Sequence, residues 1–306
     1  MPKKLENTQS ELSVAKKVVL KSLFSLKEHP VIVSLVTMAI YIVAAFGFLK
    51  LFTSLLGPLH ANTTAAFAMD GLIAIICCVI LGITYGKGFL WKTGERPSIS
   101  PKTTAIGTLK WVVLFAIVWF ASIVLPLWVD AFQTGKWNDV FGVAQGHWTV
   151  QYLLLTAVAA PISEELLFRG VVFDGLSRTW MPSVLAAIIS SFLFSWFHGA
   201  SVVRLASTFI IGLFLCAYYM RTRCLLGCFV FHSLSNLLLI PVGGMTIPQE
   251  FVVGGGPVIV SVAALAVVCF LIVTEGKQQG GRKTKVINDV ADAEEGMETV
   301  SANNNG

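Results

Sequence analysis

Three apolar segments of the chain contain ionisable side chains that are able to carry out hydrolysis. The first segment holds Glu164, Glu165 and Arg169 between long runs of apolar residues. A charged side chain at the centre of a bilayer costs at least a few kcal/mol, so such residues generally face a protein interior and have a function. A solvated run of surface charge does not fit their position.

The two adjacent carboxylates are expected to do different things. On a helix, Glu165 and Arg169 are i, i+4 neighbours in the orientation that favours an ion pair, which would keep Glu165 ionised and structural. Glu164 points about 100° away around the helix and has no partner in its own helix. An unpaired carboxylate in an apolar segment is suited to act as a general base.

Two of the five histidines also lie in apolar segments. His198 follows Phe194 by one helical turn, and His232 precedes Asn236 by one turn. A lone histidine in such a segment is more often a satisfied core residue. Two of them, with an asparagine and the Glu-Glu-xxx-Arg cluster, favour a site that polarises water, attacks a carbonyl and stabilises an oxyanion.

The composition places these residues in a membrane. Of 306 residues, 55% are hydrophobic and only 13% are charged, and the mean hydropathy is +0.76. Soluble domains have roughly 25% charged residues, and so few charges cannot form a water-soluble surface. Collagen, coiled coils, disordered chains and disulfide-rich scaffolds are excluded as well. We therefore expect an all-α, polytopic membrane protein.

Eight apolar segments are candidates to cross a bilayer, because about 20 residues of helix span its hydrocarbon core. The predicted spans are 31–49, 71–85, 111–129, 148–176, 182–198, 203–220, 224–242 and 257–274. With the N-terminus inside, these spans place 18 of the 22 Lys and Arg residues on the cytoplasmic side, as the positive-inside rule requires. The sequence therefore predicts eight transmembrane helices around a polar intramembrane site, with both termini cytoplasmic, in the plasma membrane.

The chain divides into five predicted regions. Residues 1–30 form a basic amphipathic segment that lies on the cytoplasmic leaflet and binds anionic lipid; a solvated basic leader is the alternative. Residues 31–147 hold transmembrane helices 1–3, residues 148–242 hold a catalytic core of helices 4–7, and residues 243–274 hold the last helix. Residues 275–306 are rich in Gly, Asn and charge, which predicts a disordered cytoplasmic tail.

In this order and setting, the motif residues resemble those of a known family. The family is CPBP, the CAAX proteases and bacteriocin-processing enzymes, also called Abi, which includes the type II CAAX prenyl endopeptidases. The resemblance rests on three ordered motifs: Glu164-Glu165-xxx-Arg169, Phe194-xxx-His198 and His232-xxx-Asn236. It covers roughly residues 148–242, and no motif position departs from the family pattern.

The resemblance implies an intramembrane endopeptidase. By position, Glu164 would activate the hydrolytic water with help from His198, and His232 and Asn236 would donate hydrogen bonds to the oxyanion of the tetrahedral intermediate. The other three motif residues would organise the site and pack against it: Glu165, Arg169 and Phe194.

A metal-free, glutamate-type mechanism is favoured over a metal-dependent one. Glu164, His198 and His232 together form an acceptable zinc-binding set. However, the sequence has no HExxH spacing, and the three ligands would come from three different helices. We therefore expect no cofactor, with zinc as the alternative.

The expected substrate is a peptide or membrane protein reached from the lipid phase or the cytoplasmic face, and no nucleic-acid partner is expected. Two rival functions stay open. A proton-coupled transporter also uses intramembrane Glu, His and Arg, but it predicts repeats in both halves, whereas the polar residues cluster in the second half here. A non-catalytic scaffold or immunity-like protein predicts loss of a motif residue, and all are present.

Overall fold

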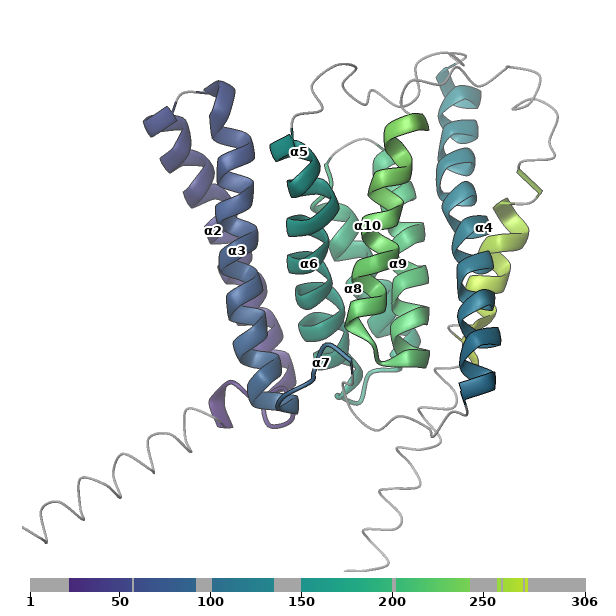
Figure 1. The fold of residues 1–306 in the computed structure, drawn as a ribbon, viewed down its shortest axis with the longest axis horizontal. Helices are drawn as coiled ribbons and strands as arrows, with labels where there is room; N and C mark the ends of the chain where they lie inside the picture. The colour runs from purple at the N-terminus through teal and green to yellow at the C-terminus, as the bar shows by residue number, and fades with distance from the viewer. Residues whose placement is uncertain are drawn as a thin grey trace, which may run out of the picture.

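The computed structural model describes residues 22–56, 58–91, 101–134, 150–199, 202–242, 258–259, 261–271 and 273–274. Within these ranges the chain is helical and has no strand. The elements, in chain order, are α2 (Pro30–Leu56), α3 (Pro58–Tyr85), α4 (Pro101–Thr134), α5 (Val150–Leu154), η1 (Leu155–Ala159), α6 (Ala160–Glu165), η2 (Leu166–Phe173), α7 (Asp174–Ser177), α8 (Ser183–Trp196), α9 (Val202–Thr222) and α10 (Leu225–Val242). The longer helices stand roughly side by side (Figure 1).

Within the described part of the chain, five helices are long and apolar enough to cross a membrane. They are Pro30–Leu55, Thr63–Tyr85, Leu109–Pro126, Val150–Ser177 and Val202–Thr222. This finding confirms the all-α membrane class and indicates an integral membrane protein. The other three predicted spans coincide with shorter apolar helices, namely Ser183–Trp196, Leu225–Leu239 and Ser261–Leu271. The number of eight crossings and the side on which the termini lie stay predictions.

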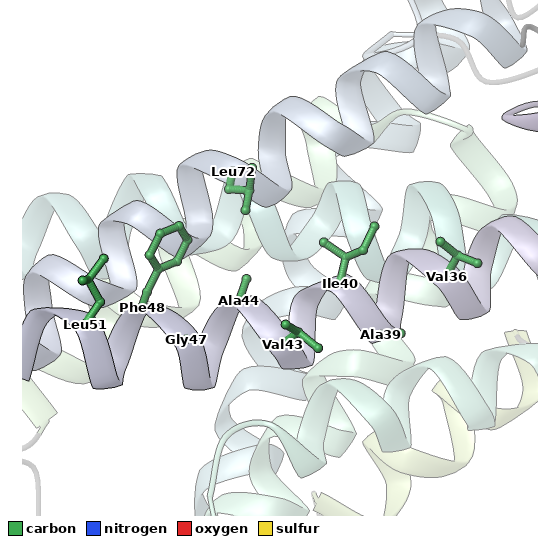
Figure 2. Close-up of a pocket in the computed structure, with 9 residues that line it drawn as sticks. All are labelled: Val36, Ala39, Ile40, Val43, Ala44, Gly47, Phe48, Leu51 and Leu72. Carbon is green, nitrogen blue, oxygen red and sulfur yellow. The ribbon is translucent and has the colours of Figure 1, made fainter.

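The outer face of α2 has the surface that a lipid environment requires. Val43 and Phe46 are 71% and 70% exposed, and such apolar exposure on a soluble protein would be unusual. An apolar pocket of about 510 Å³ runs along this helix, lined by residues such as Val36 and Phe48 and closed on one side by Leu72 of α3 (Figure 2). We infer that this side of α2 faces hydrocarbon.

The helical segment 150–177 lies in the centre of the packing. Its π-helical part η2 contacts α2, α3, α8 and α9, while η1 and α6 contact α10. All eight residues of η2 are buried. Gly212 of α9 allows a close approach between α9 and α8, because a Cβ at that position would lie 3.0–3.2 Å from Ser191 of α8. Helices from both halves of the chain thus enclose the segment that carries the motif carboxylates.

The predicted terminal regions lie largely outside the described residues. Residues 1–21 of the amphipathic segment, the 243–257 stretch and the tail 275–306 are among these. Residues 22–29 are described, and Leu26 there is fully buried, with its backbone N–H donating to Thr84 Oγ1 at 3.1 Å. Leu26 therefore packs into the helix bundle.

A buried carboxylate joins three parts of the chain at one end of the bundle. Asp174 Oδ2 accepts a hydrogen bond from Arg178 Nε at 2.8 Å, and its Oδ1 accepts one from Arg223 at 2.8 Å. Tyr85 of α3 donates its hydroxyl proton to the same carboxylate. Asp174 is 1% exposed, whereas the two arginine side chains are partly exposed. The carboxylate thus ties α3, α7 and the α9–α10 connection together.

Replacing Asp174 with Ala is expected to destabilise the fold by about 3 kcal/mol, because breaking a buried charge pair leaves its partners uncompensated. The check is the thermal unfolding midpoint of detergent-purified protein. Glu28→Gln is the matched control, since Glu28 is exposed. If both variants unfold at the wild-type temperature, the cluster does not stabilise the fold.

Candidate active site

The carboxylates lie on a helix of irregular pitch. Two π-helical stretches, η1 and η2, flank the α-helical piece α6 that carries Glu164 and Glu165. π-Helical turns are rare and occur frequently at functional sites. The two neighbouring carboxylates on this segment meet different partners.

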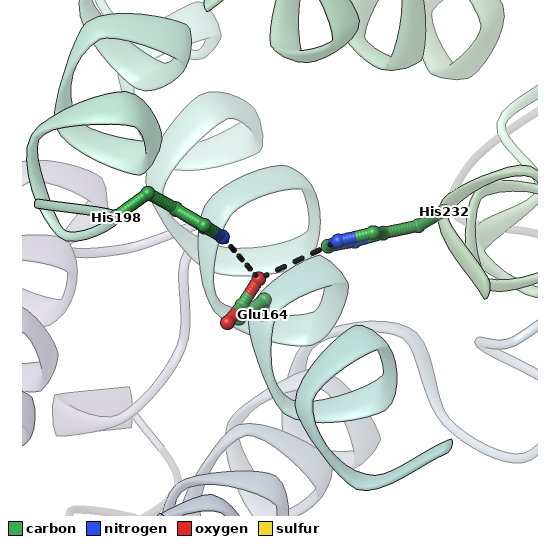
Figure 3. Close-up of side chains that lie close together, drawn as sticks. All are labelled: Glu164, His198 and His232. Carbon is green, nitrogen blue, oxygen red and sulfur yellow. Dashed lines mark ion pairs between the residues drawn. The ribbon is translucent and has the colours of Figure 1, made fainter. Parts of the chain in front are cut away.

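Glu164 lies between the two histidines (Figure 3). Its Oε2 is 3.6 Å from Nε2 of His198 and 3.7 Å from Nε2 of His232. The three side chains come from α6, from the residues just after α8, and from α10. The exposures of Glu164, His198 and His232 are 13%, 23% and 3%, so the cluster is nearly enclosed and is most accessible at His198. Glu164 Oε2 itself has no hydrogen-bond partner among the described residues.

The imidazole of His198 is held by a hydrogen bond from Nδ1 to the last turn of α8. Nδ1 lies 2.8 Å from the carbonyl oxygen of Phe194, and a carbonyl only accepts hydrogen bonds. Nδ1 therefore carries a proton, and in the neutral form of the ring Nε2 would present its lone pair to Glu164. The Phe194 ring packs on the imidazole with their centroids 4.5 Å apart, which limits its rotation.

His232 is held in the same way by a carboxylate. Its Nδ1 donates to Glu165 Oε1 at 2.8 Å, and Arg169 donates to the same oxygen at 2.7 Å. Arg169 also donates to the carbonyl of Gly212 at 3.2 Å. Because Glu165 and Arg169 are fully buried, this ion pair forms a rigid support behind His232.

Phe194 connects the two histidines with the arginine. Its ring centroid lies 4.5 Å from the guanidinium carbon of Arg169, and its ring meets the His232 ring edge-on, with centroids 5.4 Å apart. A cation over an aromatic face is stabilising when both are desolvated. The arrangement explains why an aromatic residue suits position 194.

Asn236 is placed differently from the other six motif residues. Its Nδ2 donates to the backbone carbonyl of Thr156 at 2.8 Å, which attaches α10 to the π-helical turn η1. The hydrogen bond described for Asn236 is therefore with η1 and not with Glu164 or the histidines. Its role as an oxyanion donor stays a prediction, and it would use the second N–H of the amide, which the bond to Thr156 leaves available.

The three central residues fit a zinc ion by donor chemistry. One oxygen and two nitrogens, from Glu164, His198 and His232, all lie within 4.8 Å of one another. Tetrahedral zinc ligands at about 2.0–2.1 Å are separated by about 3.4 Å, close to the 3.6 and 3.7 Å between Glu164 Oε2 and the two histidine nitrogens. Each histidine also donates its other N–H to an acceptor, as zinc-bound histidines do. A zinc ion held by these residues would polarise a bound water and a substrate carbonyl.

Two polar residues near this cluster were not predicted from the sequence. Asp70 of α3 is 2% exposed, and its Oδ1 accepts a hydrogen bond from Ser163 at 2.7 Å. Tyr41 of α2 is 6% exposed, and its ring packs on Phe197. The predicted span 71–85 begins one residue after Asp70 and so leaves this residue outside the membrane, whereas the structure places it within the helix Thr63–Tyr85.

An all-helical membrane protein with an enclosed Glu-His-His cluster falls in the class of candidate intramembrane hydrolases. Within this chain, residues 146–238 match the family model described as type II CAAX prenyl endopeptidase Rce1-like. The match confirms the resemblance predicted for residues 148–242, and it supports a protease of CAAX type. No curated protein and no solved structure matches the chain. All seven motif residues lie inside the matched segment, but Tyr41 and Asp70 lie outside it.

Proposed function

We propose that this protein is an intramembrane endopeptidase that hydrolyses peptide bonds of membrane-associated or lipidated substrates. The observation that carries the proposal is the position of Glu164 Oε2 between the Nε2 atoms of His198 and His232. The match to the Rce1-like family supports the same reaction class.

Glu164 acts as the general base in the proposed mechanism. A water molecule beside its Oε2 transfers a proton to the carboxylate as the oxygen attacks the substrate carbonyl. His198 accepts a hydrogen bond from the same water through its Nε2 lone pair, which fixes the direction of attack. Protonated Glu164 then returns the proton to the leaving amine.

His232 stabilises the oxyanion as an imidazolium. The proton on Nδ1 is used in the hydrogen bond to Glu165. Nε2 can therefore donate to the oxyanion only when it carries a proton of its own, which makes the ring an imidazolium. The carboxylate of Glu165 compensates that positive charge, and Arg169 holds the carboxylate in place. Asn236 is the proposed second donor. Donors that are preorganised in this way typically contribute a factor of about 10²–10³ to the rate.

The proposal is tested with a panel of quenched peptides, some carrying a C-terminal lipid and some bare, and with detergent-purified protein. Wild type is expected to cleave at least one membrane-associated or lipidated peptide. His232→Ala is expected to lose activity by at least about 10²-fold, while the exposed-residue variant Glu28→Gln stays at the wild-type rate. Equal cleavage by His232→Ala and wild type would overturn the site assignment.

Metal removal separates the two forms of this mechanism. We propose the metal-free form, so activity is expected to withstand a strong chelator, and the active protein is expected to contain far less than one zinc per chain. The check is a cleavage assay with parallel metal analysis. Activity that is lost to the chelator and restored by zinc would instead assign Glu164, His198 and His232 as metal ligands.

A further inference from the structure

A buried aspartate lies next to the catalytic segment but outside the part of the chain that matches the protease family. Asp70 belongs to the membrane-crossing helix Thr63–Tyr85, and apolar residues flank it on both sides in the sequence. A carboxylate in such a helix is costly and generally has a function. Its described hydrogen-bond partner is the hydroxyl of Ser163, which is itself fully buried.

The bond to Ser163 reaches the backbone that carries Glu164. Ser163 Oγ is 2.7 Å from Asp70 Oδ1 and 3.0 Å from the carbonyl oxygen of Ala160. Since the hydroxyl has one proton, it donates to the stronger acceptor, the carboxylate. Ser163 directly precedes Glu164, so this bond fixes the rotation of α6 relative to α3.

Such an anchor matters because Glu164 Oε2 accepts no hydrogen bond among the described residues. Its contacts with the two histidine Nε2 atoms are 3.6 and 3.7 Å long, so its place between them depends on the backbone that carries it. That backbone is the short α6, with π-helical turns on both sides. A small rotation of α6 would move the carboxylate out of the line between the two Nε2 atoms.

The chemistry of this contact differs from that of other hydrogen bonds that join distant segments of the protein. Ser34 of α2 donates to the backbone carbonyl of Val171, and Thr84 of α3 accepts from the backbone of Leu26. Those contacts need no charged group. Asp70, in contrast, is a carboxylate, which accepts the hydroxyl proton of Ser163 at 2.7 Å more strongly than a backbone carbonyl would.

We propose that Asp70 is a positioning residue of the active site, which holds Glu164 in its working orientation through Ser163. Asp70 is then the residue through which α3 acts on the active site. The inference rests on the proposed protease function.

The test is a double-mutant cycle with Asp70→Ala, Ser163→Ala and the combination of both. Each single variant is expected to lower kcat by about 10-fold or more, as loss of a hydrogen bond to a charged group would, with KM nearly unchanged. The double variant is expected to be no slower than the slower single variant, because both changes break the same bond. Asp70→Asn keeps an acceptor for Ser163 and is expected to retain most of kcat.

Thr84→Val is the matched control. It removes a buried hydrogen bond elsewhere in α3, the one that Thr84 accepts from the backbone of Leu26. The variant is expected to leave kcat per folded molecule at the wild-type value. A merely structural role of Asp70 would lower the yield of folded protein without separating kcat from KM. Wild-type kcat in Asp70→Ala, or fully additive losses in the cycle, would overturn the inference.

A second measurement does not depend on activity. Dicyclohexylcarbodiimide reacts with carboxyl groups in membrane proteins, and mass spectrometry can follow its reaction at Glu164. The rate at Glu164 is expected to change by at least about threefold in Asp70→Ala and Ser163→Ala and to stay at the wild-type value in Asp70→Asn and Thr84→Val. Equal rates in all variants would overturn the positioning role. Failure of wild type to cleave any peptide would instead count against the proposed function, and the labelling rates would still decide the role of Asp70.

Discussion

Glu164→Gln is expected to lower kcat by about 10²–10⁴-fold, the usual contribution of a general base. The amide is nearly the same size as the carboxylate but cannot take the proton of the attacking water. Because Glu164 Oε2 accepts no hydrogen bond among the described residues, the change removes no hydrogen bond of that atom and weakens only its longer contacts of 3.6 and 3.7 Å with the two histidines. The unfolding midpoint in detergent should therefore stay close to the wild-type value.

Steady-state cleavage of the best peptide in the panel checks this expectation, with the unfolding midpoint measured on the same preparations. Glu28→Gln makes the same chemical change at an exposed position and should match wild type in both. A Glu164→Gln variant that keeps more than about a tenth of wild-type kcat would contradict the assignment of Glu164 as the base.

Arg169→Met is expected to destabilise the protein by about 3–5 kcal/mol, because it leaves the fully buried Glu165 without its counter-charge. The guanidinium also bonds the carbonyl of Gly212 and stacks on Phe194, and both contacts are lost. Thermal unfolding in detergent and the yield of folded protein are the measurements.

The double variant Glu165→Gln with Arg169→Met is expected to recover much of this stability. The pair is then neutral, and the amide oxygen that the first substitution introduces can still accept the Nδ1–H of His232. Arg204→Met is the control for loss of an arginine, since Arg204 is exposed. If the double variant were as unstable as Arg169→Met alone, the uncompensated charge would not be the cause.

Most of the site was predictable because its chemistry conflicts with its surroundings. Glu164, His198 and His232 stand out as ionisable residues in apolar segments, and the structure brings the three together. The ion pair of Glu165 and Arg169 follows from their i, i+4 spacing, and it is present at 2.7 Å.

The features that escaped prediction depend on contacts between distant segments. Asp70 lies 93 positions from Ser163 in the chain, and the end of an apolar run does not mark where a helix ends. The π-helical turns η1 and η2 leave no signature in the order of apolar residues, because the same side chains also fit a regular helix. The bond from Asn236 to Thr156 joins α10 to one of these turns, so it was not predictable either.

The helix count shows where hydropathy alone is limited. Helix α8 is apolar but has only 14 residues, so its length alone keeps it out of the set. The helix Val150–Ser177 carries Glu164, Glu165 and Arg169 and is still long and apolar enough to cross a membrane. Residues that serve a polar site therefore do not by themselves exclude a span.

Cleavage of a susceptible peptide in H₂¹⁸O, by wild type and by Glu164→Gln in parallel, tests the central claim most directly. Water that attacks the carbonyl under the control of Glu164 should place one ¹⁸O atom in the new C-terminal carboxylate of the product, and the variant should release almost no product. Labelled product formed by the variant at the wild-type rate would contradict the account, because hydrolysis would then take place without Glu164.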